Sequence, residues 1–254
     1  MVKYDLTDRV VIITGGSAGL GEQFAYGFAE SGAHVVLAAR RKKLLDKIVK
    51  KVSKDYGVRA LAFKADVSKE KEVIDMVDFT VDKLGTVDVL INNAGMYVFK
   101  PLLEQTIEDW NKVMDVNLTS AFVASREVAR IMIPKKHGSM INISSTFGFG
   151  ATRFTEVSYY TSKAGMNLLT KALAIELGEH NIRVNGIAPG FFPTAMSIEA
   201  MTDKEISKII KDRTALPMFA ENEWIRGAAC FLASDDAKYI TGHTLAVDGG
   251  WMAF

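Results

Sequence analysis

The sequence is poor in cysteine and proline, and it has no excess of charge of either sign. Its 254 residues include one cysteine, Cys230, and five prolines, while 31 basic side chains balance 30 acidic ones. A single cysteine cannot form a disulfide within the chain, which favours a reduced, cytoplasmic setting. A net charge near zero argues against proteins whose main partners are polyanions or acidic membranes. We therefore expect a small-molecule substrate as the principal partner.

Long apolar runs are also missing. The longest ones, such as residues 10–13, have the length of a strand, far below the roughly 20 residues that a membrane helix needs. Residues 1–8 mix lysine with aspartate and contain no apolar stretch typical of a secretory signal. The sequence therefore predicts a soluble protein with no membrane partner.

Seven short runs of apolar, largely β-branched residues alternate with longer amphipathic segments. This alternation is typical of a parallel sheet covered by helices on both faces. No linker of biased composition and no repeat divides the chain. We predict a single α/β domain over residues 1–254, with strands at residues 10–13, 35–38, 60–63, 87–91, 140–143, 184–187 and 245–247.

The segment 42–54 combines apolar residues at helical spacing with six lysines. This pattern predicts an amphipathic helix whose apolar stripe includes Leu44, Leu45 and Ile48. A basic helix face can bind nucleic acid, but no aromatic residues are interleaved with these lysines. A solvated face is favoured, and no nucleic-acid partner is expected.

A glycine-rich turn, TGGSAGLG at residues 14–21, follows the first predicted strand and leads into a helical pattern. Strand, glycine turn and helix together form the arrangement that binds dinucleotides. The glycines let the backbone approach the pyrophosphate, and the helix N-terminus attracts it. A simple tight turn is the alternative, but the order of the elements favours a Rossmann-type, doubly wound domain.

The spacing Gly15-x-x-x-Gly19-x-Gly21 resembles that of the short-chain dehydrogenase/reductase family. Similar family motifs occur along nearly the whole chain, at residues 66–67, 92–95, 189–194 and 247–250. The resemblance implies an oxidoreductase with a nicotinamide cofactor. The cofactor-binding residues that it implies are Gly15, Ser17, Gly19, Leu20, Gly21, Arg40, Arg41, Asp66, Val67, Asn93, Ala94, Gly95, Tyr159, Lys163, Pro189, Gly190, Phe192 and Thr194.

A tyrosine and a lysine four residues apart, Tyr159 and Lys163, fall within one predicted helix. They lie on the same helix face, where the ammonium favours the phenolate, and a nicotinamide cation adds to this effect. The resemblance implies that Tyr159 transfers the proton and that Lys163 also binds the nicotinamide ribose. It further implies that Ser145 orients the substrate oxygen, with Ser144 as the competing candidate, and that Asn117 holds a water chain.

No metal is expected, because the four histidines are scattered singly along the chain. The predicted catalytic residues are Asn117, Ser145, Tyr159 and Lys163.

The end of the second predicted strand indicates which nicotinamide cofactor is used. NAD enzymes commonly place an acidic residue there to bind the ribose hydroxyls, whereas this chain has Ala39 followed by Arg40 and Arg41. The resemblance implies that Arg40 clamps a 2′-phosphate, for which its fork geometry is suited. NADP(H) is therefore predicted, with NAD(H) left open. The alternative is that both arginines merely begin the basic helix.

The segment 191–219 lacks strand character and is predicted to be a lid over the substrate. The run DRTALP at residues 212–217, with the terminal Gly-Gly-Trp, resembles the gluconate 5-dehydrogenase branch of the family. That branch implies sugar acids or polyols such as gluconate and 5-ketogluconate, and Arg153 and Arg213 are candidates to bind a carboxylate. Alternatives are 3-oxoacyl, sugar, steroid and small-ketone substrates, or a catalytically silent NADP-sensing scaffold.

The chain end, residues 251–254, is apolar, and the predicted helices over residues 111–132 and 158–177 are amphipathic. These surfaces and the family resemblance together predict a homotetramer. The alternative for the chain end is that it covers the core of its own subunit.

Overall fold

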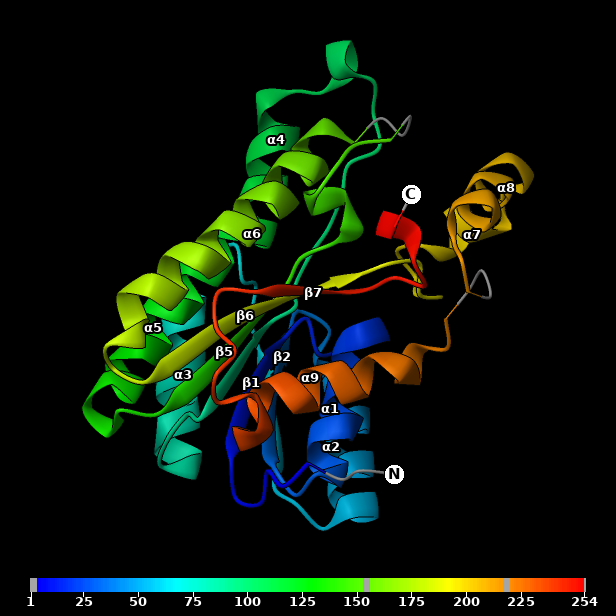
Figure 1. Cartoon of the computed structure of the whole chain (residues 1–254). Helices are drawn as coiled ribbons and strands as arrows, with labels where there is room; N and C mark the ends of the chain where they lie inside the picture. The colour runs from blue at the N-terminus through cyan, green and yellow to red at the C-terminus, as the bar shows by residue number, and fades with distance from the viewer. Residues whose placement is uncertain (1–3, 153–155, 217–219, 254) are drawn as a thin grey trace.

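The computed structural model describes residues 4–152, 156–216 and 220–253. Within this part of the chain the strands form one parallel sheet in the order β3-β2-β1-β4-β5-β6-β7, the order of a doubly wound Rossmann domain (Figure 1). Each predicted strand is confirmed, with shifts of one to two residues at some ends. The strands are β1 Val10–Thr14, β2 His34–Ala39, β3 Ala60–Lys64, β4 Val89–Asn92, β5 Gly138–Ile143, β6 Ile182–Pro189 and β7 Thr244–Val247.

Helices cover both faces of the sheet. One face packs against α1 (Gly19–Glu30), α2 (Lys42–Tyr56) and α9 (Ile225–Ala233). The other packs against α3 (Glu70–Leu84), α5 (Ser120–Lys135) and α6 (Val157–Gly178). The remaining described α-helices are α4 (Ile107–Met114), α7 (Ile198–Thr202) and α8 (Lys204–Arg213). No described helix combines the length and apolar character that crossing a bilayer requires.

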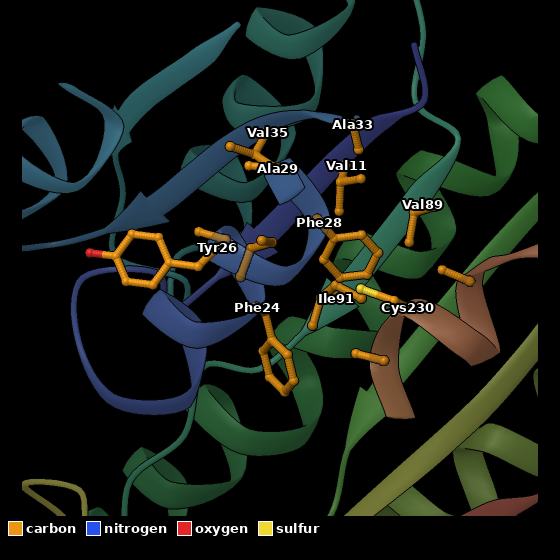
Figure 2. Packing of buried hydrophobic residues seen from close by; sticks show 14 of the residues in the cluster. Val11, Phe24, Tyr26, Phe28, Ala29, Ala33, Val35, Val89, Ile91 and Cys230 are labelled. Atoms are coloured by element: carbon orange, nitrogen blue, oxygen red, sulfur yellow. The ribbon is translucent and has the colours of Figure 1, made fainter. Parts of the chain in front are cut away.

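Alternation along each central strand divides the core into two clusters. In β1, Val11 and Ile13 face the first cluster, whereas Ile12 between them faces the second. Figure 2 shows Phe28 of α1 beside Val11 of β1 and the buried Cys230 of α9. Because both faces are covered, the strands contain apolar residues on both faces, which is why their pattern was recognisable in the sequence.

The basic helix α2 buries one stripe of side chains, as predicted. Leu45, Ile48 and Val52 are buried against the sheet. Leu44 was expected in this stripe but is exposed, because the two leucines are adjacent and point in different directions around the helix.

A buried chain of amides lies beneath the carboxyl ends of the central strands. The Nδ2 atom of Asn92 in β4 donates to Oδ1 of Asn142 in β5 at 2.9 Å. Nδ2 of Asn142 donates in turn to Oγ1 of Thr170 in α6, also at 2.9 Å. These bonds fix α6 against the two strands at whose ends the site is built.

The segment after β6 contains the short helices α7 and α8, which stand above the carboxyl ends of the strands beside the C-terminal segment (Figure 1). Trp251 of that C-terminal segment is buried in its own chain, with its ring centroid 5.0 Å from that of Phe191. At this residue the alternative interpretation of the apolar chain end is therefore correct. Residues 217–219, which complete the predicted lid, and Phe254 lie outside the described residues.

Candidate active site

The carboxyl ends of the strands surround a cavity of about 700 Å³. Its wall comes from the glycine turn, the ends of β2 to β6, the start of α6, residues 190–197 after β6, and the start of α8. All predicted cofactor-binding residues line it, as do Ser145, Tyr159 and Lys163. Asn117 is the exception, because it is fully buried behind the wall. Residues that are far apart in the sequence thus meet at the sheet edge where the strand order reverses.

The glycine turn has backbone conformations and close backbone contacts that disfavour residues with a side chain. Gly15 and Gly19 have φ values of +68° and +59°, in the left-handed region. A Cβ atom on Gly21 would lie 2.4 Å from the carbonyl oxygen of Gly15, so a side chain there is excluded. The turn therefore brings the backbone and the first turn of α1 directly to the cavity.

The turn is held against the end of β4. Oγ1 of Thr14 accepts hydrogen bonds from the backbone N–H groups of Asn93 at 3.0 Å and Ala94 at 3.1 Å. Nδ2 of Asn93 donates to the carbonyl oxygen of Thr14 at 2.8 Å. The glycine turn and residues 93–95 consequently form one rigid side of the cavity.

The ends of β2 and β3 carry basic and acidic groups. Nε and Nη2 of Arg41 donate to Oγ of Ser17 at 3.2 and 2.9 Å, which links the arginine to the glycine turn. Burial opposes ionisation of Asp66, but its hydrogen bonds with Ser68 and the charge of Arg40 hold its pKa below the ordinary value. Both arginines and Asp66 line the same end of the cavity.

The hydroxyl group of Ser145 lies next to that of Tyr159 and favours its ionised form. Oγ of Ser144 donates instead to the main-chain oxygen of Lys163 at 3.1 Å, a contact between β5 and α6. The structure thus brings the later of the two serines to the tyrosine, and the role of Ser145 toward the substrate oxygen stays a prediction. Lys163 lies beneath, with Nζ 5.6 Å from the centre of the Tyr159 ring and donating to the carbonyl oxygen of Ile143 at 2.7 Å.

Burial shifts the pKa values of both groups. It raises the pKa of Tyr159 to about 12, although the hydrogen bond with Ser145 opposes the rise. It lowers the pKa of Lys163 to about 8. In the protein alone, burial therefore outweighs the predicted stabilisation of the phenolate. The sequence analysis predicted that Lys163 and a nicotinamide cation together favour the phenolate of Tyr159, and this combined effect stays a prediction.

Asn117 lies in a π-helical turn, Asp115–Thr119, between α4 and α5. Its Oδ1 accepts from the N–H of Met96 at 2.8 Å, and its Nδ2 donates to Met96 O at 2.8 Å and to Oγ of Ser162 at 2.9 Å. Asn117 thereby fastens the segment after β4 to the residue next to Lys163. Such π-helical turns are frequent at functional sites.

Aromatic rings cover the cavity beside Tyr159. The ring centroid of Phe147 lies 6.4 Å from that of Tyr159 and 6.0 Å from that of Phe191. Of the two predicted carboxylate-binding arginines, Arg213 stacks on Trp251 at 4.6 Å and does not line the cavity. Arg153 lies outside the described residues.

The sequence interpretation missed Glu156, which lines the cavity at the start of α6. It lies three residues before Tyr159, and residues at this spacing share a helix face. Helical spacing counted backwards from the predicted tyrosine is the signal that points to it. Burial raises the pKa of its carboxyl group to about 7.

Known proteins resemble the chain over its whole length. A family model described as enoyl-(acyl carrier protein) reductase matches residues 15–252. The chain belongs to the short-chain dehydrogenase/reductase family. As a member of this family it is an oxidoreductase that acts on alcohol or carbonyl groups.

Several family members with known names or structures are similar to it. The chain is 37% identical over 254 residues to 2-dehydro-3-deoxy-D-gluconate 5-dehydrogenase of Dickeya dadantii, with 98% of each chain covered. It is 33% identical over 249 residues to 5-keto-D-gluconate 5-reductase of Escherichia coli K12, covering 98% of this chain and 97% of the relative. A solved structure from Beutenbergia cavernae, described as a candidate NAD(P)-dependent gluconate 5-dehydrogenase with NADP bound at low occupancy, matches with 34% identity, complete coverage of both chains and a TM-score of 0.91.

Proposed function

We propose that this oxidoreductase is an NADP(H)-dependent enzyme that transfers a hydride reversibly between the nicotinamide and an alcohol or carbonyl carbon of a polyhydroxylated substrate. The observation that carries the proposal is the meeting of Ser145, Tyr159 and Lys163 with the glycine turn in one cavity. When bound, the nicotinamide supplies the hydride or accepts it.

The chain's residues fit such a cofactor. The positive φ angles of the turn and the excluded side chain at Gly21 leave the backbone accessible to a pyrophosphate. Pro189, Gly190 and Thr194 line the cavity near the end of β6, where the family resemblance places the nicotinamide. Arg40, with Arg41 and Ser17, would hold the 2′-phosphate of NADP. The NADP in the Beutenbergia cavernae structure supports this choice.

The roles of the side chains follow from their positions. The Tyr159 phenol gives a proton to the substrate oxygen in reduction and takes it back in oxidation. Ser145, whose hydroxyl lies next to that phenol, donates to the same oxygen and stabilises the charge that develops on it. Lys163 favours the phenolate and binds the ribose, while Asn117 positions the segments around the lysine and holds the water chain.

For the substrate we propose a sugar acid or polyol, the class to which gluconate and 5-ketogluconate belong. The support is the names of the relatives from Dickeya dadantii and Escherichia coli. The segment 191–219, whose described part includes α7 and α8, would act as the lid. The cytoplasmic setting expected from the single cysteine stays a prediction.

A spectrophotometric panel tests the function. NADPH oxidation and NADP reduction are followed at 340 nm with keto-gluconates, polyols, sugars, 3-oxoacyl esters and cyclic ketones. We expect turnover with at least one polyhydroxylated compound. A lack of hydride transfer with every member would favour the silent NADP-sensing scaffold.

We expect the enzyme to be a homotetramer. Apolar side chains remain exposed on two neighbouring helices, including Phe122 on α5 and Leu168 and Ile175 on α6, of which Ile175 is 84% exposed. Burying such faces between identical subunits lowers the free energy of a closed, symmetric assembly. Light scattering at micromolar protein concentration should give four times the subunit mass, and a monomeric mass would contradict the prediction.

A further inference from the structure

The charges of the cavity are distributed unevenly. Arg40 and Arg41 lie at the end of β2, while the side nearest Ser145 and Tyr159 is lined by a carboxyl group, that of Glu156. Among the described residues, the charged side chains of the wall are Arg40, Arg41, Asp66, Glu156, Lys163 and Asp203. The substrate therefore meets an acidic group close to the reacting atoms.

Among the residues that the structure describes, Glu156 has no partner that accounts for its place. It occupies the N-cap of α6, where an acidic side chain ordinarily accepts a hydrogen bond from the first helical turn, yet its side chain makes no such bond. Within the described part of the chain its carboxyl group takes part in no hydrogen bond or ion pair. It is only half-buried, and its charge acts on the phenol of Tyr159. It is therefore free to contact a ligand.

The described wall has one cation near Glu156, Lys163, and in the proposed function its ammonium serves the cofactor ribose and the Tyr159 phenolate rather than a substrate carboxylate. Nζ of Lys163 donates to the carbonyl oxygen of Ile143 at 2.7 Å, beneath the tyrosine. The guanidinium of Arg213 stacks on Trp251, away from the lining. A carboxylate bound here would meet Glu156 without compensation, and like charges in a partly dry site repel strongly.

We propose that Glu156 is a specificity-determining residue that selects uncharged polyols and ketoses over sugar acids. Its carboxyl group accepts a hydrogen bond from a substrate hydroxyl and disfavours a carboxylate in the same position. This inference rests on the proposed function and narrows its substrate class. It also gives this enzyme a substrate preference that differs from the sugar acids after which its relatives are named.

The selection depends on pH. Apart from Glu156, the titratable groups of the described wall are Arg40, Arg41, Asp66, Tyr97, Tyr159, Lys163 and Asp203, the last at the N-cap of α8. Burial places the pKa of Glu156 at about 7, that of Lys163 at about 8 and that of Tyr159 at about 12. Above pH 7 Glu156 is ionised and repels a carboxylate, whereas below it the protonated group does not. Discrimination against sugar acids should therefore increase as pH rises through 7.

The test compares D-gluconate with D-glucitol, which differ by a carboxylate in place of a hydroxymethyl group. We expect kcat/KM with NADP to favour D-glucitol by about 10-fold or more, mainly through KM. Glu156→Gln keeps the shape and removes the charge, so this preference and its pH dependence should largely disappear. Glu176→Gln, the same change at an exposed position of α6, should leave the preference as in the wild type.

The outcomes separate the inference from the proposed function. A preference for D-gluconate, or an unchanged ratio in Glu156→Gln, overturns the selective role of Glu156 while leaving hydride transfer established. If neither compound reacts, 5-keto-D-gluconate and L-sorbose form the matched pair for reduction. Inactivity with both uncharged members overturns the inferred substrate class, and inactivity across the whole panel contradicts the proposed function itself.

Discussion

Tyr159→Phe is expected to lower kcat by at least about 100-fold, the usual minimum for loss of a positioned acid or base. The phenol lines the cavity next to Ser145, and phenylalanine leaves no group in its place that can exchange a proton. Phenylalanine keeps the ring that packs edge-on against Phe147. The fold and NADP(H) binding should therefore be retained, as measured by thermal unfolding and by fluorescence titration of NADPH.

The neighbouring tyrosine provides a matched control. The hydroxyl of Tyr160 lies 2.9 Å from Oγ1 of Thr152, and Tyr160 does not line the cavity. Tyr160→Phe should keep kcat within a few-fold of the wild type. Near-normal turnover in Tyr159→Phe, or an equal loss in both variants, would show that Tyr159 is not the proton-transferring group.

Arg40→Ala is expected to weaken NADP(H) binding by about 10- to 150-fold while scarcely changing NAD(H) binding. Loss of a charge-assisted hydrogen bond costs roughly 1.5–3 kcal/mol, which gives this range. Ala39→Asp should shift the cofactor preference further towards NAD(H), because a carboxylate beside the ribose repels the 2′-phosphate and accepts hydrogen bonds from free hydroxyls. Dissociation constants of both cofactors, measured by titration, give the ratio directly.

Lys42→Ala serves as the control for a general loss of positive charge. Lys42 begins α2 next to the two arginines, but its ammonium is paired with Asp46 and does not line the cavity. Its removal should leave the ratio of the two dissociation constants nearly unchanged. A wild-type preference for NAD(H), or an unaltered ratio in Arg40→Ala, would refute the predicted specificity while leaving the family membership intact.

The sheet was predictable from the sequence because both of its faces are buried. Strands such as β1 and β4 are then apolar runs that stand out against the amphipathic helices. The cofactor side of the cavity was predictable for a related reason. The glycine turn must have particular residues at particular spacings, whatever the substrate.

The substrate side could not be predicted to the same degree. Its wall is formed by segments between the regular elements, and the partners of each side chain there are set by tertiary contacts. Arg213 has the charge to bind a carboxylate, yet it stacks on Trp251, which follows it by 38 positions. Glu156 has the sequence position of an ordinary helix-capping acid, and the structure shows that it makes no cap bond and lines the cavity instead.

The strand order has a consequence for how the chain folds. β1 lies inside the sheet between β2 and β4, and the backbone N–H of Val10 bonds to the side chain of Asp88, just before β4 and 78 positions away. Pairing between such distant segments must overcome the entropy of closing a long loop, which slows folding. The cavity wall extends from Gly15 to Ile206. During synthesis β1 therefore pairs with β4 only after β4 itself has been made. A complete nucleotide site forms only after most of the chain has left the ribosome.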